Sequence, residues 1–149
     1  MEYEELPEEL QSPPEKRMVG TLITQNPHPL SMIVSMMMVL FITFVSYLSW
    51  INYGVLSEYL PAINRNIFSQ GEVWRAFSAV LIHGDIVHLA SNMYMLGIFS
   101  FFVYGYFGSK MYPLWTFIGA GVVNFISVYT YPPDVRLLGA SGWVYLLGG

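Results

Sequence analysis

The sequence contains no cysteine, and charged side chains make up only 11% of its 149 residues. Without cysteine the chain can form no disulfide, no thiolate metal site and no cysteine nucleophile. Only six residues are lysine or arginine, and they form no basic patch that would bind nucleic acid. Hydrophobic residues instead make up 54% of the chain and aromatic residues 17%. This composition leaves too little polar surface for a water-soluble protein, and it predicts a membrane protein.

Most of the acidic residues lie near the start of the chain, interspersed with proline. This start lacks the basic residues and the apolar core of a secretory signal, and its acidity argues against a transit peptide. We expect residues 1–29 to form a solvated, disordered tail and residues 30–149 to form the membrane domain. The short tail and the lack of a targeting signal lead us to expect a bacterial inner membrane.

Uncharged, largely apolar stretches predict the membrane spans. Leu30 to Tyr53 and Ile86 to Ser109 are each 24 residues long, and Met111 to Pro133 is a third such stretch; about 20 residues suffice to cross the hydrocarbon core. Leu137 to Gly149 begins a fourth stretch, which as a helix would cover only about 20 Å of a core roughly 30 Å thick. We therefore expect an all-α polytopic bundle that is incomplete at its C-terminus. The alternative is a short helix that starts deep in the protein.

Two features between these stretches bear on packing. The segment from Glu58 to Leu81 mixes turn-forming and polar residues with scattered hydrophobic ones. It fits a segment lying in the membrane interface and an ordinary polar loop equally well. Gly119 and Gly121, inside the third stretch, would allow another helix to approach closely.

His88 and Asn92 lie four residues apart near the start of the second stretch, so a helix would place both on one face. An imidazole and a carboxamide that converge offer two hydrogen-bond donors, which can stabilise an oxyanion in a dry site. Taken alone, the pair fits interhelical hydrogen bonding better. His83 lies about 140° around a helix from His88, which argues against a metal or haem pair.

Ser141 lies between glycines at the start of the fourth stretch, in the run Leu-Gly-Ala-Ser-Gly-Trp. Gly139 and Gly142 would permit a sharp turn and close approach of another chain. The serine hydroxyl could then face a substrate, and the free N–H groups of a helix start could bind an oxyanion. Tyr145 would lie one turn further along the same face. Taken alone, the glycines fit a small-residue packing motif better.

Together these motifs resemble the rhomboid family in order and spacing, over a region from about Leu30 to the end. The matching pieces are Trp74-Arg75, His83-x4-His88-x3-Asn92 and Gly139-Ala140-Ser141-Gly142-x-x-Tyr145. The resemblance implies a bundle of six transmembrane helices, of which four would be present here. It also implies an intramembrane serine protease that cleaves transmembrane segments of other proteins within the lipid bilayer, with no metal or cofactor.

The resemblance also implies a role for each matching residue. Ser141 would be the nucleophile, and His88 and Asn92 would be oxyanion donors together with the Ser141 backbone N–H. Tyr145 would stack on the histidine that serves as general base, and His83 would support the site. Trp74 and Arg75 would hold the first loop in the membrane.

Two departures from the family pattern stand out. Tyr104 occupies a position where a glutamate often anchors the turn after the second helix. The family's general base lies on the sixth helix, so none of the three histidines here takes that role, and a serine without a base is a poor nucleophile. The alternatives are a catalytically inactive rhomboid-like protein that binds transmembrane helices and a plain structural bundle.

Overall fold

The computed structural model describes residues 24–52, 54 and 56–149. Most of the expected acidic tail, residues 1–23, lies outside the described residues. The described elements, in chain order, are α2 (Ser31–Ile51), α3 (Leu56–Tyr59), β1 (Ala62–Ile63), α4 (Asn64–Gln70), α5 (Arg75–Ser78), η2 (Ala79–Leu81), α6 (Ile86–Phe107), η3 (Gly108–Lys110), α7 (Leu114–Tyr129), β2 (Arg136–Leu137) and α8 (Ser141–Gly148). The expectation of a mainly helical protein is confirmed, with two very short strands added.

Two helices are long and apolar enough to cross a membrane, Ser31–Ile51 and Ile86–Lys110, with mean hydropathies of 2.1 and 1.6. They coincide closely with the first two predicted spans. The third predicted span contains α7, whose 16 residues extend about 24 Å, because Pro113 precedes it and Pro132 follows it. Four membrane crossings therefore remain a prediction.

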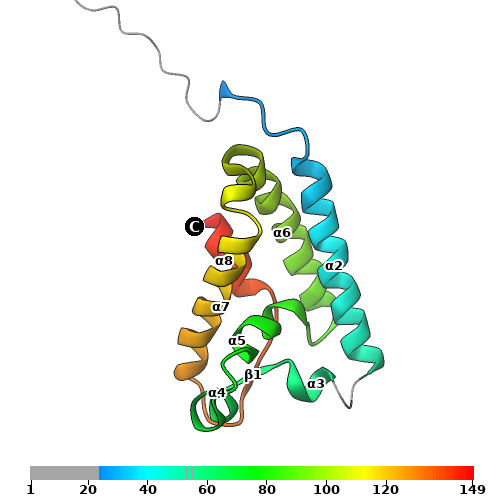
Figure 1. Cartoon of the computed structure of the whole chain (residues 1–149). Helices are drawn as coiled ribbons and strands as arrows, with labels where there is room; N and C mark the ends of the chain where they lie inside the picture. The colour runs from blue at the N-terminus through cyan, green and yellow to red at the C-terminus, as the bar shows by residue number, and fades with distance from the viewer. Residues whose placement is uncertain (1–23, 53, 55) are drawn as a thin grey trace, which may run out of the picture.

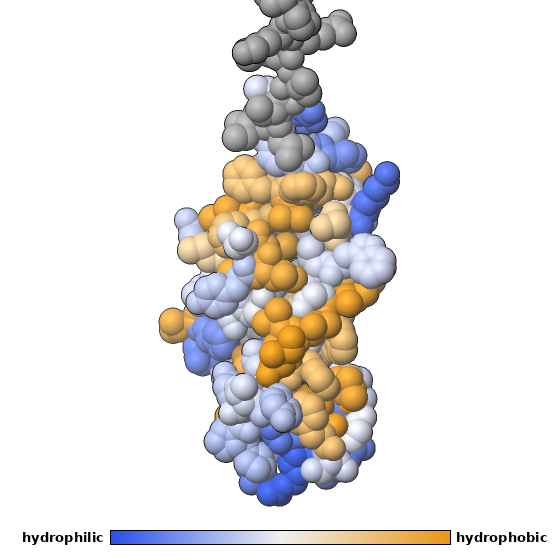
Figure 2. Space-filling view, turned by 90° about the vertical axis from the view of Figure 1, so that its left-hand side faces the viewer, coloured by the Kyte–Doolittle hydropathy of each residue, from blue (hydrophilic) through white to orange (hydrophobic). Residues whose placement is uncertain are grey.

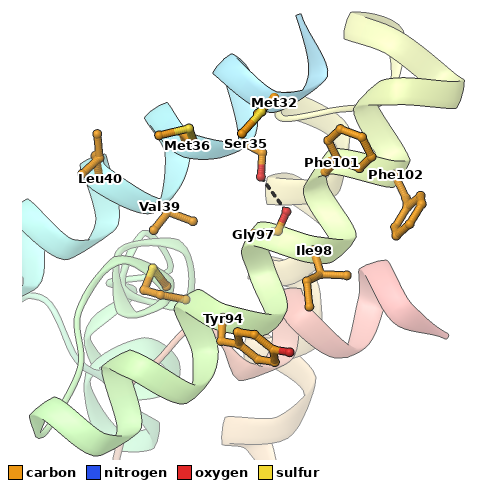
Figure 3. A pocket seen from close by; sticks show the side chains of 11 residues that line it. Met32, Ser35, Met36, Val39, Leu40, Tyr94, Gly97, Ile98, Phe101 and Phe102 are labelled. Atoms are coloured by element: carbon orange, nitrogen blue, oxygen red, sulfur yellow. Dashed lines mark hydrogen bonds between the residues drawn. The ribbon is translucent and has the colours of Figure 1, made fainter. Parts of the chain in front are cut away.

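Small and polar residues join α2 to α6, which run side by side (Figure 1). Ser35 Oγ donates a hydrogen bond to the Gly97 carbonyl at 2.6 Å and lies 2.7 Å from Ser100 Oγ. Beside this contact lies a cavity of about 550 Å³ with largely apolar walls (Figure 3). Ser141 and Asn92 do not line it, so it is separate from the expected site.

The core lies where α6, α7 and α8 meet (Figure 1). Trp143 of α8 is its largest buried side chain; its ring stacks on Tyr112 at a centroid distance of 5.9 Å and meets Phe117 edge-on at 5.4 Å. Gly121 lies directly against the Phe77 ring, leaving no room for a Cβ atom. The close approach expected at Gly121 is therefore present, and it joins α7 to α5.

The segment from Glu58 to Leu81 is ordered into helical turns and the strand β1, which lie together at one end of the molecule (Figure 1). Strand β1 pairs antiparallel with β2, with Ala62 opposite Leu137 and Ile63 opposite Arg136. The backbone of this segment is thus tied to the residues that precede α8. Its position relative to the membrane interface stays a prediction.

Apolar side chains cover much of the outer surface. Figure 2 shows them across the middle of one face, with hydrophilic residues gathered at its lower end. On α7, Trp115 and Ile126 are each more than 60% exposed. A surface of this kind favours contact with lipid over contact with water.

Candidate active site

The turn before α8 has a backbone conformation that requires glycine. Gly139 has a φ of +113°, and its N–H donates to the Ala79 carbonyl at 2.9 Å. A Cβ atom at Gly139 would lie 2.6 Å from Cε1 of His88. The turn and the histidine are therefore packed so closely that only a hydrogen fits between them. Ser141 follows as the first residue of α8.

Helix α8 leaves its first N–H groups available. The first backbone bond of the helix runs from the Val144 N–H to the Ala140 carbonyl, at 2.9 Å. The N–H groups of Ser141 and Gly142 precede this bond and have no carbonyl one turn earlier in the helix. Such groups can donate to an anion near the Ser141 side chain.

His83 accepts a hydrogen bond from the backbone next to Ser141. The Ala140 N–H donates to Nε2 of His83 at 3.1 Å, and the His83 and His88 rings meet edge-on with centroids 5.1 Å apart. His83 lies outside both spanning helices. Burial and, to a smaller extent, the nearby His88 lower its pKa to about 4, with Asp85 acting in the opposite direction. A neutral His83 agrees with its role as an acceptor.

His88 and Asn92 lie on the first turns of α6, as their spacing predicts. Asp85 caps this helix by accepting a hydrogen bond from the His88 N–H at 2.8 Å. Nδ2 of the buried Asn92 donates to the His88 carbonyl at 3.1 Å. Because a carboxamide nitrogen carries two hydrogens, one remains for another acceptor.

A cavity of about 450 Å³ brings several of the predicted site residues together. Asn92 of α6 lines it with Ser141 and Tyr145 of α8, and the Tyr145 side chain is 78% exposed. Met95 and Phe99 supply apolar wall on the α6 side. The half-buried His88 is not part of this lining and lies against Gly139 instead. The cavity therefore joins a serine hydroxyl, a carboxamide and a helix start.

Gly142, the second glycine beside the serine, faces α7. A Cβ atom there would lie 3.1 Å from Asn124 Oδ1 and 3.3 Å from Val123 Cγ1. Asn124 Nδ2 in turn donates to the Ala76 carbonyl at 3.1 Å. This glycine therefore lets the start of α8 pack tightly on α7.

Arg75 organises the first loop from a buried position, with 2% of its surface exposed. Its Nη1 donates to the carbonyls of Glu58 and Tyr59, each at 2.7 Å, and its Nε donates to the Glu72 carboxylate. The guanidinium also lies 5.0 Å from the centroid of the Trp74 ring. Hydrogen bonds from Asn66 and from Arg75 hold the pKa of Glu72 below its ordinary value. These contacts support the loop-holding role expected of Trp74 and Arg75, which stays a prediction.

Replacing Arg75 with alanine should lower the free energy of unfolding by about 2 kcal/mol, because two carbonyls and a carboxylate lose a buried donor. Thermal unfolding in detergent micelles, followed by circular dichroism, would measure this. The control is Arg65→Ala, which removes an exposed ion pair to Asp134 with side chains 57% and 72% accessible, and which should cost less than about 1 kcal/mol. Equal losses in the two variants would contradict the role given to Arg75.

The model of the rhomboid domain matches residues 70–149, more than half of the chain. This stretch includes every site residue predicted from the sequence, from Trp74 to Tyr145. The chain belongs to the rhomboid family. No curated protein and no solved structure matches it.

Membership of the rhomboid family, together with the two long apolar helices, makes the chain an integral membrane protein. Members of the family are generally serine intramembrane proteases that act on transmembrane substrates. The roles given to individual residues remain expectations. Among these residues, the structure brings Asn92, Ser141 and Tyr145 to one cavity and places His83 and His88 beside the turn that precedes Ser141.

Two features of the rhomboid chain's site were not predicted from its sequence. Asp85 caps α6, and an aspartate three residues before the first bonded N–H is a recognisable capping signal. Ser46 lies 3.0 Å from Nδ1 of His83, and nothing in the local sequence indicates that contact. At the other end of α6, Tyr104 meets His28 edge-on at 5.3 Å, where the family often has a glutamate.

Proposed function

We propose that the chain carries the nucleophile and the oxyanion-binding groups of an intramembrane serine endopeptidase, located in a bacterial inner membrane, that cleaves transmembrane segments. The observation that carries this proposal is the shared cavity, which Ser141 and Asn92 line from two different helices. Acyl transfer needs a nucleophile and hydrogen-bond donors that converge on the same carbonyl group. The family match makes that reaction the expected one.

In the proposed reaction a histidine beyond Gly149 takes the proton from Ser141 Oγ. The oxygen attacks a substrate carbonyl carbon, and the carbonyl electrons move onto its oxygen. Asn92 and the Ser141 N–H hold the resulting negative charge. His88, which packs on Gly139 outside the cavity lining, would have to turn toward the oxyanion to act as the third donor. The tetrahedral species then expels the amine, which takes the proton from the base. Water repeats the sequence and releases the substrate carboxylate, so the cavity must admit water.

The three histidines of the sequence have other surroundings in the structure. Nδ1 of His28 accepts from the Leu30 N–H at the start of α2, and both ring nitrogens of His83 have partners. His88 packs on Gly139. In the described part of the chain, no histidine is hydrogen-bonded to Ser141. The second candidate is a catalytically inactive rhomboid-like protein that binds transmembrane helices.

The gene separates the two candidates. Extending the chain by the codons that follow Gly149 should give a product that cleaves a transmembrane substrate in liposomes, while the 149-residue chain should be almost inactive because serine lacks its base. A stop codon directly after Gly149, or an extended product without cleavage, would favour the inactive binder.

Asn92→Ala in the extended product should lower kcat by about 10²-fold, because one donor to the oxyanion is lost, while KM stays nearly constant. Asn52→Ala is a matched control, since Asn52 Nδ2 also donates to a carbonyl four residues earlier, that of Leu48, but lies at the exposed end of α2. The control should keep its kcat. Unchanged cleavage by the Asn92 variant would remove this residue from the proposed oxyanion site.

A further inference from the structure

We propose that Ser46, on the first spanning helix, is a positioning residue for the nucleophile and acts through His83 on the backbone of Ala140. This inference rests on the proposed function, because it concerns the placement of Ser141. It adds a residue from α2 to a site whose other parts come from α6, α8 and the turn before α8. The path consists of two hydrogen bonds, and a third holds Ser46 on the Leu81 carbonyl. The directions of all three can be worked out.

The direction of the bonds follows from the one donor that is fixed. The Ala140 backbone N–H can only donate, so Nε2 of His83, 3.1 Å away, must carry no hydrogen. The single hydrogen of the neutral imidazole therefore lies on Nδ1, which donates to Ser46 Oγ at 3.0 Å. Ser46 then donates its own hydrogen to the Leu81 carbonyl at 3.2 Å. One arrangement of hydrogens satisfies all four groups.

The serine fixes which ring nitrogen carries the hydrogen. If Nε2 carried it instead, the N–H of Ala140 would face another N–H, and the turn before Ser141 would lose its acceptor. Ser46 favours the correct tautomer because its oxygen is placed to accept from Nδ1. Both side chains are buried, with Ser46 0% and His83 2% exposed, so neither is in contact with bulk water. A donor or acceptor left without a partner here would lower the free energy of unfolding more than one at the surface would.

Helix α2 forms a second hydrogen bond to the same histidine. Nε1 of Trp50, one turn after Ser46, donates to the His83 carbonyl at 2.7 Å. The backbone and the side chain of His83 are therefore both held by α2. If Ser46 served only to join two helices, its hydrogen bonds would lead to a residue of another helix. This path ends instead on the residue directly before Ser141.

Several charged or titratable groups surround His83. His88 faces it from α6, Asp85 lies in the turn between them, and Arg136 of β2 lines a small cavity beside it. Burial and His88 lower the pKa of His83 from 6.5 to about 4, and Asp85 acts in the opposite direction. Because the folded pKa is below the ordinary value, the stability from the neutral ring is complete above pH 6.5 and is lost as the pH falls toward 4. Above that window the ring remains an acceptor for Ala140.

The test is Ser46→Ala, read in two independent ways. In the 149-residue chain in micelles, ¹⁵N NMR of the histidine rings should show His83 with its hydrogen on Nδ1 at pH 7. In Ser46→Ala the Nε2–H form should appear, and amide exchange at Ala140 should speed up at least 10-fold. In the extended, active product, kcat should fall about 10-fold while KM stays constant, because Ser141 is misplaced and substrate contacts are not.

Ser49→Ala is the matched control. Ser49 is also buried on α2 and lines the small cavity beside His83, but its Oγ donates to the Ser46 carbonyl within the same helix rather than to the His83 ring. Because Ser49 is not hydrogen-bonded to the imidazole, Ser49→Ala should leave the His83 tautomer and kcat unchanged. Ser46→Thr, which keeps the hydroxyl, should restore the Nδ1–H form.

The two readouts separate this inference from the proposed function. A wild-type His83 with its hydrogen on Nε2, or a tautomer unaffected by Ser46→Ala, would overturn the inference whether or not the protein is a protease. A tautomer change with unaltered kcat in an active product would also overturn it, because the path would then not reach the nucleophile. If the product cleaves nothing but the tautomer change occurs, the proposed function fails and the structural path stands.

Discussion

Replacing Ser141 with alanine is expected to lower cleavage of a transmembrane substrate by at least about 10³-fold in the product that contains the general base. Alanine leaves the cavity and the start of α8 intact but has no oxygen to attack the substrate carbonyl. A fluorophosphonate probe, which reacts with activated serines, should label the wild type and fail to label the variant. Cleavage in liposomes measures the reaction rate, and labelling shows whether Ser141 is the reactive serine.

Ser127→Ala provides the control for this substitution. Ser127 lies on α7, is half-buried, and donates to the Val123 carbonyl of its own helix. Its loss should leave both cleavage and labelling near the wild-type level. Equal labelling of wild type and Ser141→Ala would exclude Ser141 as the nucleophile. Residual cleavage above background would point to a contaminating protease or to another nucleophile.

Replacing Gly139 with alanine is expected to lower the free energy of unfolding by about 4 kcal/mol. About 2 kcal/mol comes from forcing a side chain into a φ of +113°. About 2 kcal/mol more comes from overpacking, because the new Cβ would lie 2.6 Å from His88 Cε1. Thermal unfolding in micelles measures the loss. Relief of the collision would move either His88 or the turn, so cleavage should fall as well.

Gly54→Ala is the matched control for this glycine. Apart from its own chain neighbours, no described atom lies within 4 Å of the position that its Cβ would take. It should change the free energy of unfolding by less than about 1 kcal/mol. If Gly139→Ala were equally harmless, the packing of His88 on the turn would be wrong.

The spanning helices could be predicted from sequence because their signal is local. A run without charge, such as Ile86 to Ser109, is enough to indicate a helix, and α6 begins at the predicted residue. The ends were less predictable where tertiary structure decides them. The fourth apolar stretch begins at Leu137, but α8 begins only at Ser141, because Leu137 pairs with Ala62 in the ladder of β1 and β2.

The candidate site divides in the same way. The spacing of His88 and Asn92 predicted one helix face, and Gly139, two residues before Ser141, predicted a sharp turn. The sequence could not show that Ser46 meets His83, because they lie 37 positions apart and a buried serine on a spanning helix has many possible partners. It also could not show that Asn92 rather than His88 would line the cavity. Which member of a helix face reaches a neighbour depends on how the helices pack.

Because β1 pairs with β2, the first loop can complete its hydrogen bonds only after the residues of β2 have been synthesised. The Arg136 guanidinium donates to the Ser57 carbonyl across 79 positions of sequence, next to the two-residue ladder. At about 5–20 residues per second, the ribosome needs several seconds to supply that partner after Ser57 has been made. Throughout this interval the backbone of β1 is an open strand edge. Nascent chains that stop before Arg136 therefore lack the strand that pairs with this edge, and those that pass Leu137 carry it.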